Sequence, residues 1–479
     1  MIRPGPPEGS AVQKTRAHAT RGDRVCIVLL SGIGDVVHGL PVAVALKRDR
    51  PSRKIVWVAQ AAPAQILEHH PAVDEVIVFR PERGLRGVYD LWNTFRTAPS
   101  CDLTLNMQRY AKSIFPAYLS GAPVRVGFAP SRTRDGVRLV NTKYTAGGDW
   151  RHTQDLFLEF LDVVGVERPT PLAWEITLSE EEESAAKTFF SASAGATVVG
   201  LALGTASRAK DWPTDRYVSL ARSLEAEFGF HVLLLGGPGE GEQMTAQAIL
   251  RDGKVAARSA LSNSVRQLIW SIRGCDLVIS PDTAALHIAH AMGVPVIGLF
   301  GHTNPWRVGP YEQYHDLIVD RYTEPGETRT PARYGARPGR MPGIAVSDVL
   351  ERVGRARERY GVGRSGCGTT IPPRGAIIRP VRTITALGRR DHTSGRWPPR
   401  TGHRLEDSNG LRWGKDRFLR EPKPYLGVAK RWQSMDLCIK PHSPRLLGHS
   451  TEGARSRSWQ TRKTPGHRGW FDVTTEAGS

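Results

Sequence analysis

Cysteine, long apolar runs and closely paired acids are all scarce in this chain of 479 residues. Its five cysteines lie far apart and form no C-x-x-C, which argues against a disulfide framework or a structural zinc site. No apolar run approaches the roughly 18 residues of a membrane span, and the first 23 residues lack the apolar core of a secretory signal. No D-x-D occurs, so the chain offers no obvious carboxylate pair for a nucleotide-bound metal. We expect a soluble protein of a reducing compartment, with neither a metal nor another cofactor.

Acidic residues are also fewer than basic ones, and the net charge is +19. The excess is concentrated in residues 365–479, which hold 22 basic and 9 acidic residues but only 18 Ile, Leu, Val or Phe. Such low apolar content predicts a disordered extension over 364–479. Residues 1–23 are rich in Pro, Gly, Ala and charged residues without periodicity, which predicts a disordered arm. The five tryptophans of the extension leave two alternatives, a basic arm that stacks on nucleic acid or an extension without function. We favour the second, because no recognisable nucleic-acid module accompanies the charge, and we expect no specific nucleic-acid partner.

The middle of the chain alternates short β-branched runs with amphipathic stretches. One series of runs covers 24–30, 54–59, 74–79 and 102–107, and a second covers 197–203, 231–237, 276–280 and 294–300. Continuous apolar strands separated by helices are typical of parallel sheets that are covered on both faces. We therefore predict an α/β protein with two Rossmann-like domains, over 24–190 and 191–345, followed by a helix over 346–363. Ligands of such sheets bind beyond the carboxyl ends of the strands.

The loop after the first predicted strand contains Gly32, Gly34 and Asp35. The two glycines permit a tight turn and close approach of a ligand. The dinucleotide fingerprint would need glycine where Val37 stands, so a nicotinamide site and an oxidoreductase are disfavoured. Asp35 is either the cap of the following helix or a carboxylate presented to a ligand between the domains.

The second series supplies two polar loops. The first, from Gly204 to Lys210, combines small residues, hydroxyls and two cations, which suits a diphosphate, although a solvated basic loop has the same composition. The second ends at Glu240, whose carboxylate can accept hydrogen bonds from a ribose hydroxyl pair.

The segment from Ser280 to His290 follows a predicted strand and opens a helix, where free amides form an anion site. A diphosphate would repel Asp282, so we expect Asp282 to face uncharged sugar hydroxyls. Thr283 lies one turn before His287 and shares its helix face. His287 is either a ligand contact or a satisfied structural group.

Together these motifs resemble glycosyltransferase family 9, the ADP-heptose:lipopolysaccharide heptosyltransferases. The resemblance covers about 24–362 and rests on SGIGDVVHGLP, HPAVDEVIVF, LSGAPVRVGF, GTASRAKDWP and SPDTAALHIAHAMGVPVIGLFG. It implies a GT-B fold and inverting, metal-independent transfer from an ADP-sugar to a lipopolysaccharide core precursor. The first domain would receive the acceptor and the second the nucleotide-sugar, at the cytoplasmic face of the inner membrane with peripheral membrane contact.

The resemblance also implies roles for individual residues. Asp35 would be the catalytic base, with Gly32 and Gly34 in the acceptor-side loop. The residues implied in donor binding are Gly204, Thr205, Ala206, Lys210, Glu240, Asp282, Thr283, Ala284 and His287. Two positions depart from the family pattern: Ala206 interrupts the hydroxyl residues of the phosphate loop, and Ala284 replaces the usual glycine. A catalytically silent nucleotide-sugar-binding protein, or a transferase that uses another nucleotide-sugar, remains the alternative.

Overall fold

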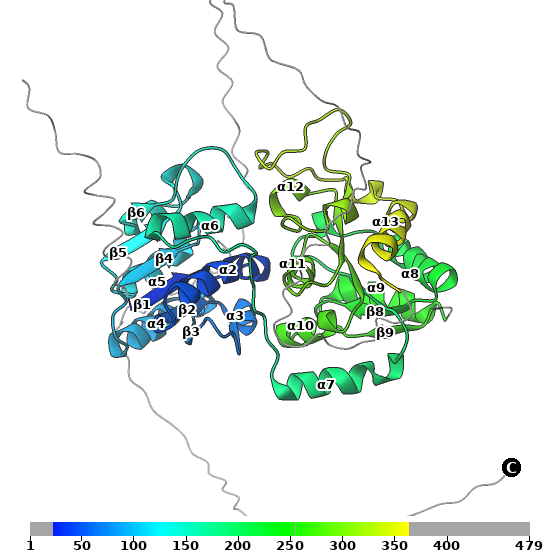
Figure 1. The fold of residues 1–479 in the computed structure, drawn as a ribbon, viewed down its shortest axis with the longest axis horizontal. Helices are drawn as coiled ribbons and strands as arrows, with labels where there is room; N and C mark the ends of the chain where they lie inside the picture. The colour runs from blue at the N-terminus through cyan, green and yellow to red at the C-terminus, as the bar shows by residue number, and fades with distance from the viewer. Residues whose placement is uncertain (1–22, 254, 364–479) are drawn as a thin grey trace, which may run out of the picture. The chain divides into compact units, whose positions relative to one another are not determined.

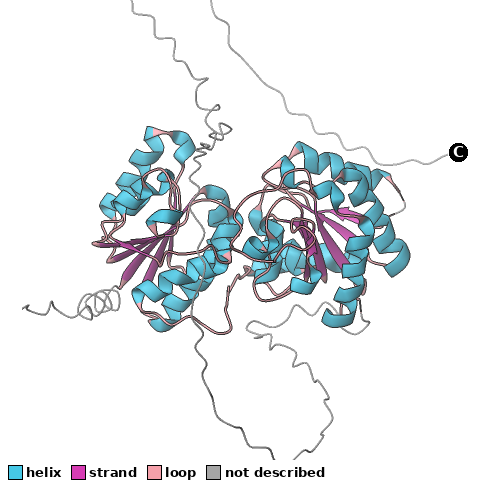
Figure 2. Ribbon diagram, turned by 90° about the horizontal axis from the view of Figure 1, so that it is seen from above, coloured by secondary structure: helices cyan, strands magenta, loops and turns pink. Residues whose placement is uncertain are grey.

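The computed structural model describes residues 23–253 and 255–363 (Figure 1). The predicted extension over 364–479 and, apart from Asp23, the predicted arm over 1–23 lie outside the described residues. Within the described part the chain forms two parallel six-stranded sheets with helices on both faces (Figure 2). The prediction of an α/β fold with two Rossmann-like sheets is confirmed.

The first sheet has the order β3-β2-β1-β4-β5-β6, with β3 (Glu75–Val78), β2 (Lys54–Ala59), β1 (Arg24–Val28), β4 (Leu103–Asn106), β5 (Val124–Gly127) and β6 (Lys143–Tyr144). Its helices are α2 (Ile33–Asp49), α3 (Ala61–Leu67), α4 (Leu85–Thr97), α5 (Ile114–Leu119) and α6 (Thr153–Val164). Alternate residues of β1 enter different apolar clusters, since Ile27 packs in one and Val28 in the other. Both faces are therefore covered, as the unbroken apolar run of the strand indicates. We call this part the first lobe.

The second sheet has the order β12-β11-β10-β7-β8-β9, with β12 (Val319–Asp320), β11 (Val296–Phe300), β10 (Leu277–Pro281), β7 (Val198–Ala202), β8 (His231–Leu235) and β9 (Ala257–Ser259). Its helices are α8 (Thr214–Phe228), α9 (Glu240–Arg251), α10 (Val265–Arg273), α11 (Ala284–Ala291), α12 (Pro305–Val308) and α13 (Val346–Tyr360). We call this part, with α7, the second lobe. The order changes direction at β7, so the loops after β7 and β10 begin side by side.

Helix α7 (Glu180–Phe190) begins at a capping box, in which Ser179 and Glu182 bond each other's backbone amides. It contacts α10, and the Phe189 ring lies 5.3 Å from that of Trp270. The sequence analysis placed these residues in the first domain, whereas their packing is with the second lobe. Sequence periodicity identifies a helix but not the surface that it covers.

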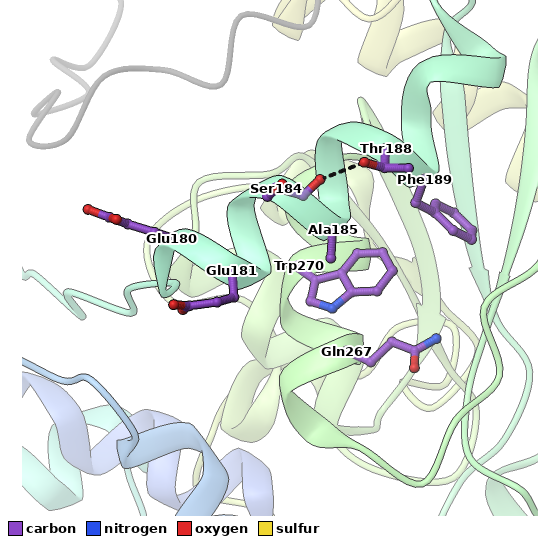
Figure 3. Close-up of a pocket in the computed structure, with 8 residues that line it drawn as sticks. All are labelled: Glu180, Glu181, Ser184, Ala185, Thr188, Phe189, Gln267 and Trp270. Carbon is purple, nitrogen blue, oxygen red and sulfur yellow. Dashed lines mark hydrogen bonds between the residues drawn. The ribbon is translucent and has the colours of Figure 1, made fainter.

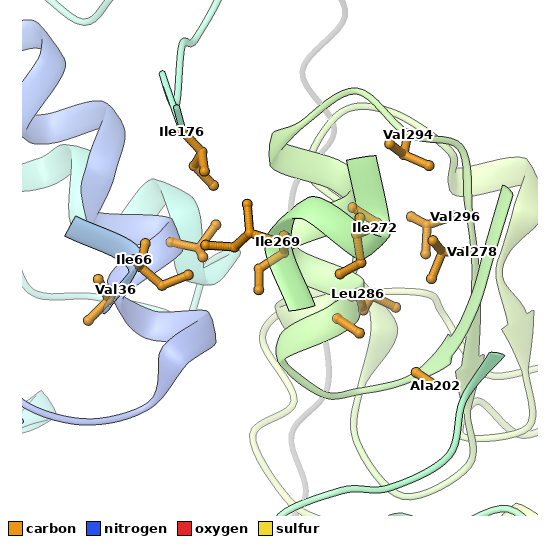
Figure 4. Close-up of a cluster of buried hydrophobic side chains, with 14 of the residues drawn as sticks. Val36, Ile66, Ile176, Ala202, Ile269, Ile272, Val278, Leu286, Val294 and Val296 are labelled. Carbon is orange, nitrogen blue, oxygen red and sulfur yellow. The ribbon is translucent and has the colours of Figure 1, made fainter. Parts of the chain in front are cut away.

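The two lobes share one apolar cluster, which Figure 4 shows between α2, α3 and α10. Polar contacts fix the same junction. The backbone amide of Val265 donates to Gln65 Oε1 at 2.9 Å, and the buried Arg266 donates to the carbonyl of Gln65 at 3.3 Å and to Glu182 Oε1 at 2.7 Å. Helix α3 of the first lobe is thereby fixed against α10 of the second. Across the described ranges, no helix combines the length and the apolar character that crossing a bilayer requires.

Candidate active site

The loop after β1 brings the Asp35 carboxylate back over Gly32. Gly32 is the N-cap of α2 with φ 83°, and a Cβ there would lie 2.5 Å from Asp35 Oδ2. Glycine is thus required both for the backbone angle and for space. Asp35 is the third residue of α2 and makes no capping hydrogen bond, so the interpretation of Asp35 as the helix cap is wrong. Its carboxylate receives no hydrogen bond and no salt bridge from the described residues.

The Asp35 side chain is reached by solvent, yet parts of both lobes crowd around it. Partial desolvation by the surrounding protein raises the pKa of this carboxyl, while the charges of His287, Arg307 and Lys112 act in the opposite direction. A carboxylate with a raised pKa accepts a proton more readily near neutral pH. The position therefore suits a general base.

Two residues that follow β4 support the same loop. The buried Gln108 accepts hydrogen bonds through Oε1 from the backbone amides of Leu30, at 3.0 Å, and Ser31, at 3.4 Å. Lys112 contacts the hydroxyl of Ser31 through Nζ. The sequence analysis missed Gln108, although its place at the end of the strand beside β1 is the signal that could have identified it.

In the second lobe, Lys210, Asp282 and His287 form one polar group. Lys210 Nζ lies 2.8 Å from Asp282 Oδ2, and His287 Nε2 lies 3.5 Å from Asp282 Oδ1. Burial alone would raise the pKa of Asp282, but the hydrogen bond with His287 and the charge of Lys210 hold it well below its ordinary value. Asp282 is therefore an anion shared by two donors.

The loop from Gly204 to Lys210 is held by hydrogen bonds among its own residues and the adjoining Asp211. The Thr205 hydroxyl lies 2.7 Å from Asp211 Oδ1 and 2.6 Å from the carbonyl of Ser207. Gly204 is needed for space, because a Cβ there would lie 2.2 Å from Glu242 Cγ. Ala206 is exposed at the turn. The hydroxyl predicted to meet a diphosphate thus holds the loop that carries Lys210.

The acid that shapes the loop after β8 is Glu242 rather than Glu240. Glu242 accepts hydrogen bonds from the amides of Gly237, at 2.7 Å, and Gly239, at 3.2 Å. Glu240 is exposed as the first residue of α9, and no hydrogen bond joins it to the other candidate residues. Glu242, the third residue of α9, thus reaches back to the amide of its own N-cap, Gly239, as the acid of a capping box does.

The N-terminus of α11 carries the remaining candidates. Thr283 is its N-cap with extended backbone and makes no capping hydrogen bond, and Ala284 is its first residue; both are half-buried. The first-turn amides of α11 therefore lie beside Asp282, where the helix end favours negative charge.

The junction of the lobes brings Asp35 to the donor-side group. A Cβ on Gly34 would lie 2.5 Å from His287 Cδ2, so the first turn of α2 is in contact with the His287 ring. The His38 ring, one turn further along α2, lies 4.7 Å from that of His287. The absence of a side chain at Gly34 thus leaves room for the His287 ring. The predicted base and the predicted sugar-binding group are therefore neighbours.

An arginine and aromatic group that the sequence analysis missed lies at the same junction. Trp150 stacks on Tyr334 with ring centroids 4.5 Å apart. The guanidinium carbon of Arg109 lies 5.2 Å from the Tyr334 ring centroid, and that of Arg307 lies 4.7 Å from it. No local sequence pattern marks this group, because its members come from four separate segments.

Away from these residues, an open groove of about 920 Å³ lies between α7 and α10, with Trp270 and Phe189 in its wall (Figure 3). It contains none of the candidate residues. Over residues 23–253 and 255–363 there is no group of three or more His, Cys, Asp or Glu side chains suited to hold a metal ion.

The two parallel α/β lobes carry polar loops at the carboxyl ends of their strands, which is where such sheets bind ligands. The model of glycosyltransferase family 9 (heptosyltransferase) matches residues 89–332, which is just over half of the chain. The chain belongs to this family, and it is a glycosyltransferase.

Curated relatives agree with this assignment. The chain is 28% identical to the lipopolysaccharide core heptosyltransferase OpsX of Haemophilus influenzae over 305 residues, which cover 63% of this chain and 85% of that protein. It is 29% identical to lipopolysaccharide heptosyltransferase 1 of Pseudomonas aeruginosa over 307 residues, 60% of this chain and 81% of that one.

Solved structures share the fold. A family 9 glycosyltransferase from Veillonella parvula has a TM-score of 0.58 at 21% identity and covers 70% of this chain and 96% of its own. The ADP-heptose lipopolysaccharide heptosyltransferase II of E. coli has a TM-score of 0.56 at 19% identity and covers 71% of this chain and 99% of its own.

Proposed function

We propose that this glycosyltransferase moves a heptose from ADP-heptose to a lipopolysaccharide inner-core acceptor, with inversion and without a metal ion. The observation that carries the proposal is the contact between the Asp35 loop and His287, because it sets a base beside a group suited to sugar and diphosphate. The names of the relatives support the heptose and the acceptor class. Structures of an E. coli heptosyltransferase hold ADP or ADP-2-deoxy-2-fluoro heptose, which supports the donor.

In this proposal the second lobe binds the donor. Lys210 and the first-turn amides of α11 face the diphosphate, while Asp282, Thr283 and His287 face the sugar. The turn Gly204–Thr205–Ala206 lies along the diphosphate, Ala284 contributes its backbone amide, and Glu240 lies near the ribose. Lys210 then shares its charge between Asp282 and the diphosphate.

The reaction needs one proton acceptor and one stabilised leaving group. The acceptor hydroxyl attacks the anomeric carbon from the face opposite the diphosphate, and Asp35 takes its proton as the new C–O bond forms. The bond from the anomeric carbon to the diphosphate breaks, and its electron pair leaves with ADP. Attack from the opposite face inverts the anomeric centre. Lys210 and the end of α11 stabilise the charge that develops on the diphosphate.

Transfer assays with a panel of nucleotide-sugars test the proposal. We expect product from ADP-heptose and a lipopolysaccharide core acceptor by mass spectrometry, an inverted anomeric linkage by NMR, and an unchanged rate in EDTA. Transfer from another nucleotide-sugar at a higher kcat/KM would overturn the donor. Binding of ADP-heptose without turnover on any core acceptor would indicate a catalytically silent binding protein instead.

A further inference from the structure

Arg307, at the second-lobe end of the site, forms no salt bridge with any acid among residues 23–253 and 255–363. Its Nε is buried and makes no hydrogen bond, and its guanidinium carbon lies over the face of Tyr334. A buried guanidinium donor without an acceptor is costly, because it has lost its water and gained nothing in exchange. Burial also lowers the pKa of Arg307, because the charged guanidinium is less stable away from water.

A second cation lies beside it. Arg109 donates through Nε to the carbonyl of Arg132 at 2.7 Å and through Nη1 to the Tyr334 hydroxyl at 3.1 Å, and no carboxylate of the described residues pairs with it. Both guanidinium groups therefore approach one tyrosine, and Arg307 also feels the charges of Asp35 and Asp282. An unpaired, partly buried pair of like charges is stabilised by an anion between them.

We propose that Arg307 and Arg109 bind an acid group of the acceptor, a carboxylate or a phosphate, close to the hydroxyl that Asp35 deprotonates. This inference rests on the proposed function and deepens it. The acceptor is the favoured source of the anion because Arg109 and Trp150 belong to the first lobe. The donor diphosphate, which has the same chemistry, already has Lys210 and the amides of α11.

The test compares Arg307→Gln with Arg329→Gln, an exposed arginine of the same lobe that stacks on Trp306 instead. We expect Arg307→Gln to raise the acceptor KM by about 10- to 100-fold, the size of a lost charge-assisted contact. The calorimetric Kd of ADP and the melting temperature should change little, and Arg329→Gln should behave as wild type. On an acceptor whose acid is a neutral amide, wild type should lose the same factor and Arg307→Gln nothing further.

Each other result decides against the inference. A loss of ADP affinity as large as the loss in acceptor KM would assign Arg307 to the diphosphate. If Arg307→Gln raised the KM equally for acidic and neutral acceptors, Arg307 would have a purely structural role. Absence of any transfer by wild type would remove the proposed function itself, and the inference with it.

A separate observation concerns the outer surface of the first lobe. Helix α4 has two apolar stripes: Leu91 is buried in the core, while Leu85, Tyr89 and Trp92 are 90%, 61% and 41% exposed. The exposed three are spaced i, i+4, i+7 and so share a face. Helix α5, which contacts α4, exposes Phe115 and Tyr118 by 54% and 66%. We call these five residues the outer aromatic surface.

Arginines accompany the outer aromatic surface. Arg80, Arg86 and Arg96 are exposed near it, and the Arg96 guanidinium carbon lies 5.0 Å from the Trp92 ring centroid. The one aspartate of α4, Asp90, is paired with Arg83. A face that joins exposed Trp, Tyr, Phe and Leu to unpaired arginines suits an anionic lipid surface. Two copies placed face to face would bring their arginines together, which disfavours self-association.

We infer that the outer aromatic surface docks on a bilayer that contains anionic phospholipid. Lys112, which reaches the Asp35 loop, lies in the turn Ala111–Ser113 that leads into α5, so docking there would present the site to a lipid-linked acceptor. Peripheral membrane contact, expected from the family resemblance, thereby acquires a defined surface.

Vesicle co-sedimentation of the full chain tests this inference. The variant Leu85→Ser/Trp92→Ser/Phe115→Ser is compared with Met244→Ser/Leu250→Ser, which removes exposed apolar side chains from α9. On phosphatidylglycerol vesicles we expect the triple variant to bind at least about tenfold more weakly, because three large apolar side chains can no longer enter the bilayer. The difference should persist in 0.5 M salt, which screens the basic extension, and the α9 variant should bind as wild type.

Activity supplies the second measurement. Transfer to an acceptor embedded in vesicles should fall in the triple variant, while transfer to a water-soluble, acyl-free acceptor should not. Vesicle binding equal to wild type would overturn the inference. The inference would also be overturned if light scattering showed that wild type is an oligomer and the triple variant a monomer. The outer aromatic surface would then be an interface between copies of the chain.

Discussion

Lys210 Nζ lies 2.8 Å from Asp282 Oδ2, so the cation proposed for the diphosphate is already neutralised by the acid proposed for the sugar. A donor must therefore share Lys210 with Asp282. The two side chains have opposite expected effects on binding of the nucleotide alone.

Asp282→Asn should leave the affinity for free ADP unchanged or increase it, because Lys210 is released and a repelling charge is removed. The affinity for ADP-heptose should fall relative to ADP, because a sugar contact is lost. Calorimetric titration with both ligands measures the ratio. Equal weakening of both ligands would show that Asp282 does not act on the sugar.

Lys210→Ala should weaken ADP and ADP-heptose alike. A charge-assisted contact to a diphosphate is worth roughly 1.5–3 kcal/mol, or about 10- to 150-fold in affinity. The same titration measures it. An effect confined to ADP-heptose would move Lys210 from the diphosphate to the sugar.

Asp35→Asn should lower kcat by about 10²- to 10⁴-fold, the usual contribution of general base catalysis, because an amide cannot take the proton. The Kd of ADP and the melting temperature should stay near those of wild type, since Asp35 makes no capping hydrogen bond. A variant that transfers heptose normally would require a different base.

Lys112→Met should shift the acid limb of the kcat/KM profile to higher pH. The base works when deprotonated, so activity is lost as pH falls through the pKa of Asp35. Lys112 lowers that pKa, and its removal should raise it further above the ordinary value. The exposed Lys143→Met of β6 is the matched control. An unshifted limb would mean that the group titrating in kcat/KM is not Asp35.

Two buried histidines should make stability depend on pH. Burial lowers the pKa of His152 to about 3 and that of His290 to about 4. The unfolded chain binds these protons near pH 6.5, so their contribution is complete above that pH and is lost as pH falls toward 4. Each histidine contributes up to about 1.4 kcal/mol per pH unit in this window.

Urea unfolding at pH 7.5, 6 and 5 measures this effect. His290→Gln keeps an N–H donor for the carbonyl of Tyr311 and should make the pH dependence shallower. The exposed His69→Asn should leave it unchanged. Parallel slopes for wild type and His290→Gln would contradict the assignment.

Gly34→Ala should lower kcat while each lobe keeps its fold. The added methyl would lie 2.5 Å from His287 Cδ2, so the α2 turn and α11 must separate. Gly241→Ala, where a Cβ meets no atom within 4 Å, is the control. Wild-type turnover in Gly34→Ala would show that the close contact is not needed for the reaction.

The sequence alone predicts both sheets and most of the loops that carry the site. Continuous apolar runs identify buried parallel strands, and polar residues at their carboxyl ends must gather at one edge of each sheet. Asp35, Lys210, Asp282 and His287 are proposed as site residues in this way, and these roles stay a prediction. The prediction of the strands succeeds because strand period is a local property of the chain.

Only the tertiary structure decides which side chains meet. Gly34 against His287, and Arg109 and Arg307 on Tyr334, join residues that lie far apart in the chain. Their contacts depend on how α2 and α3 pack against α10 and α11, which no period within a segment encodes. Likewise Glu242, rather than Glu240, holds the turn after β8, because the pitch of α9 returns the third residue of the helix to its own cap.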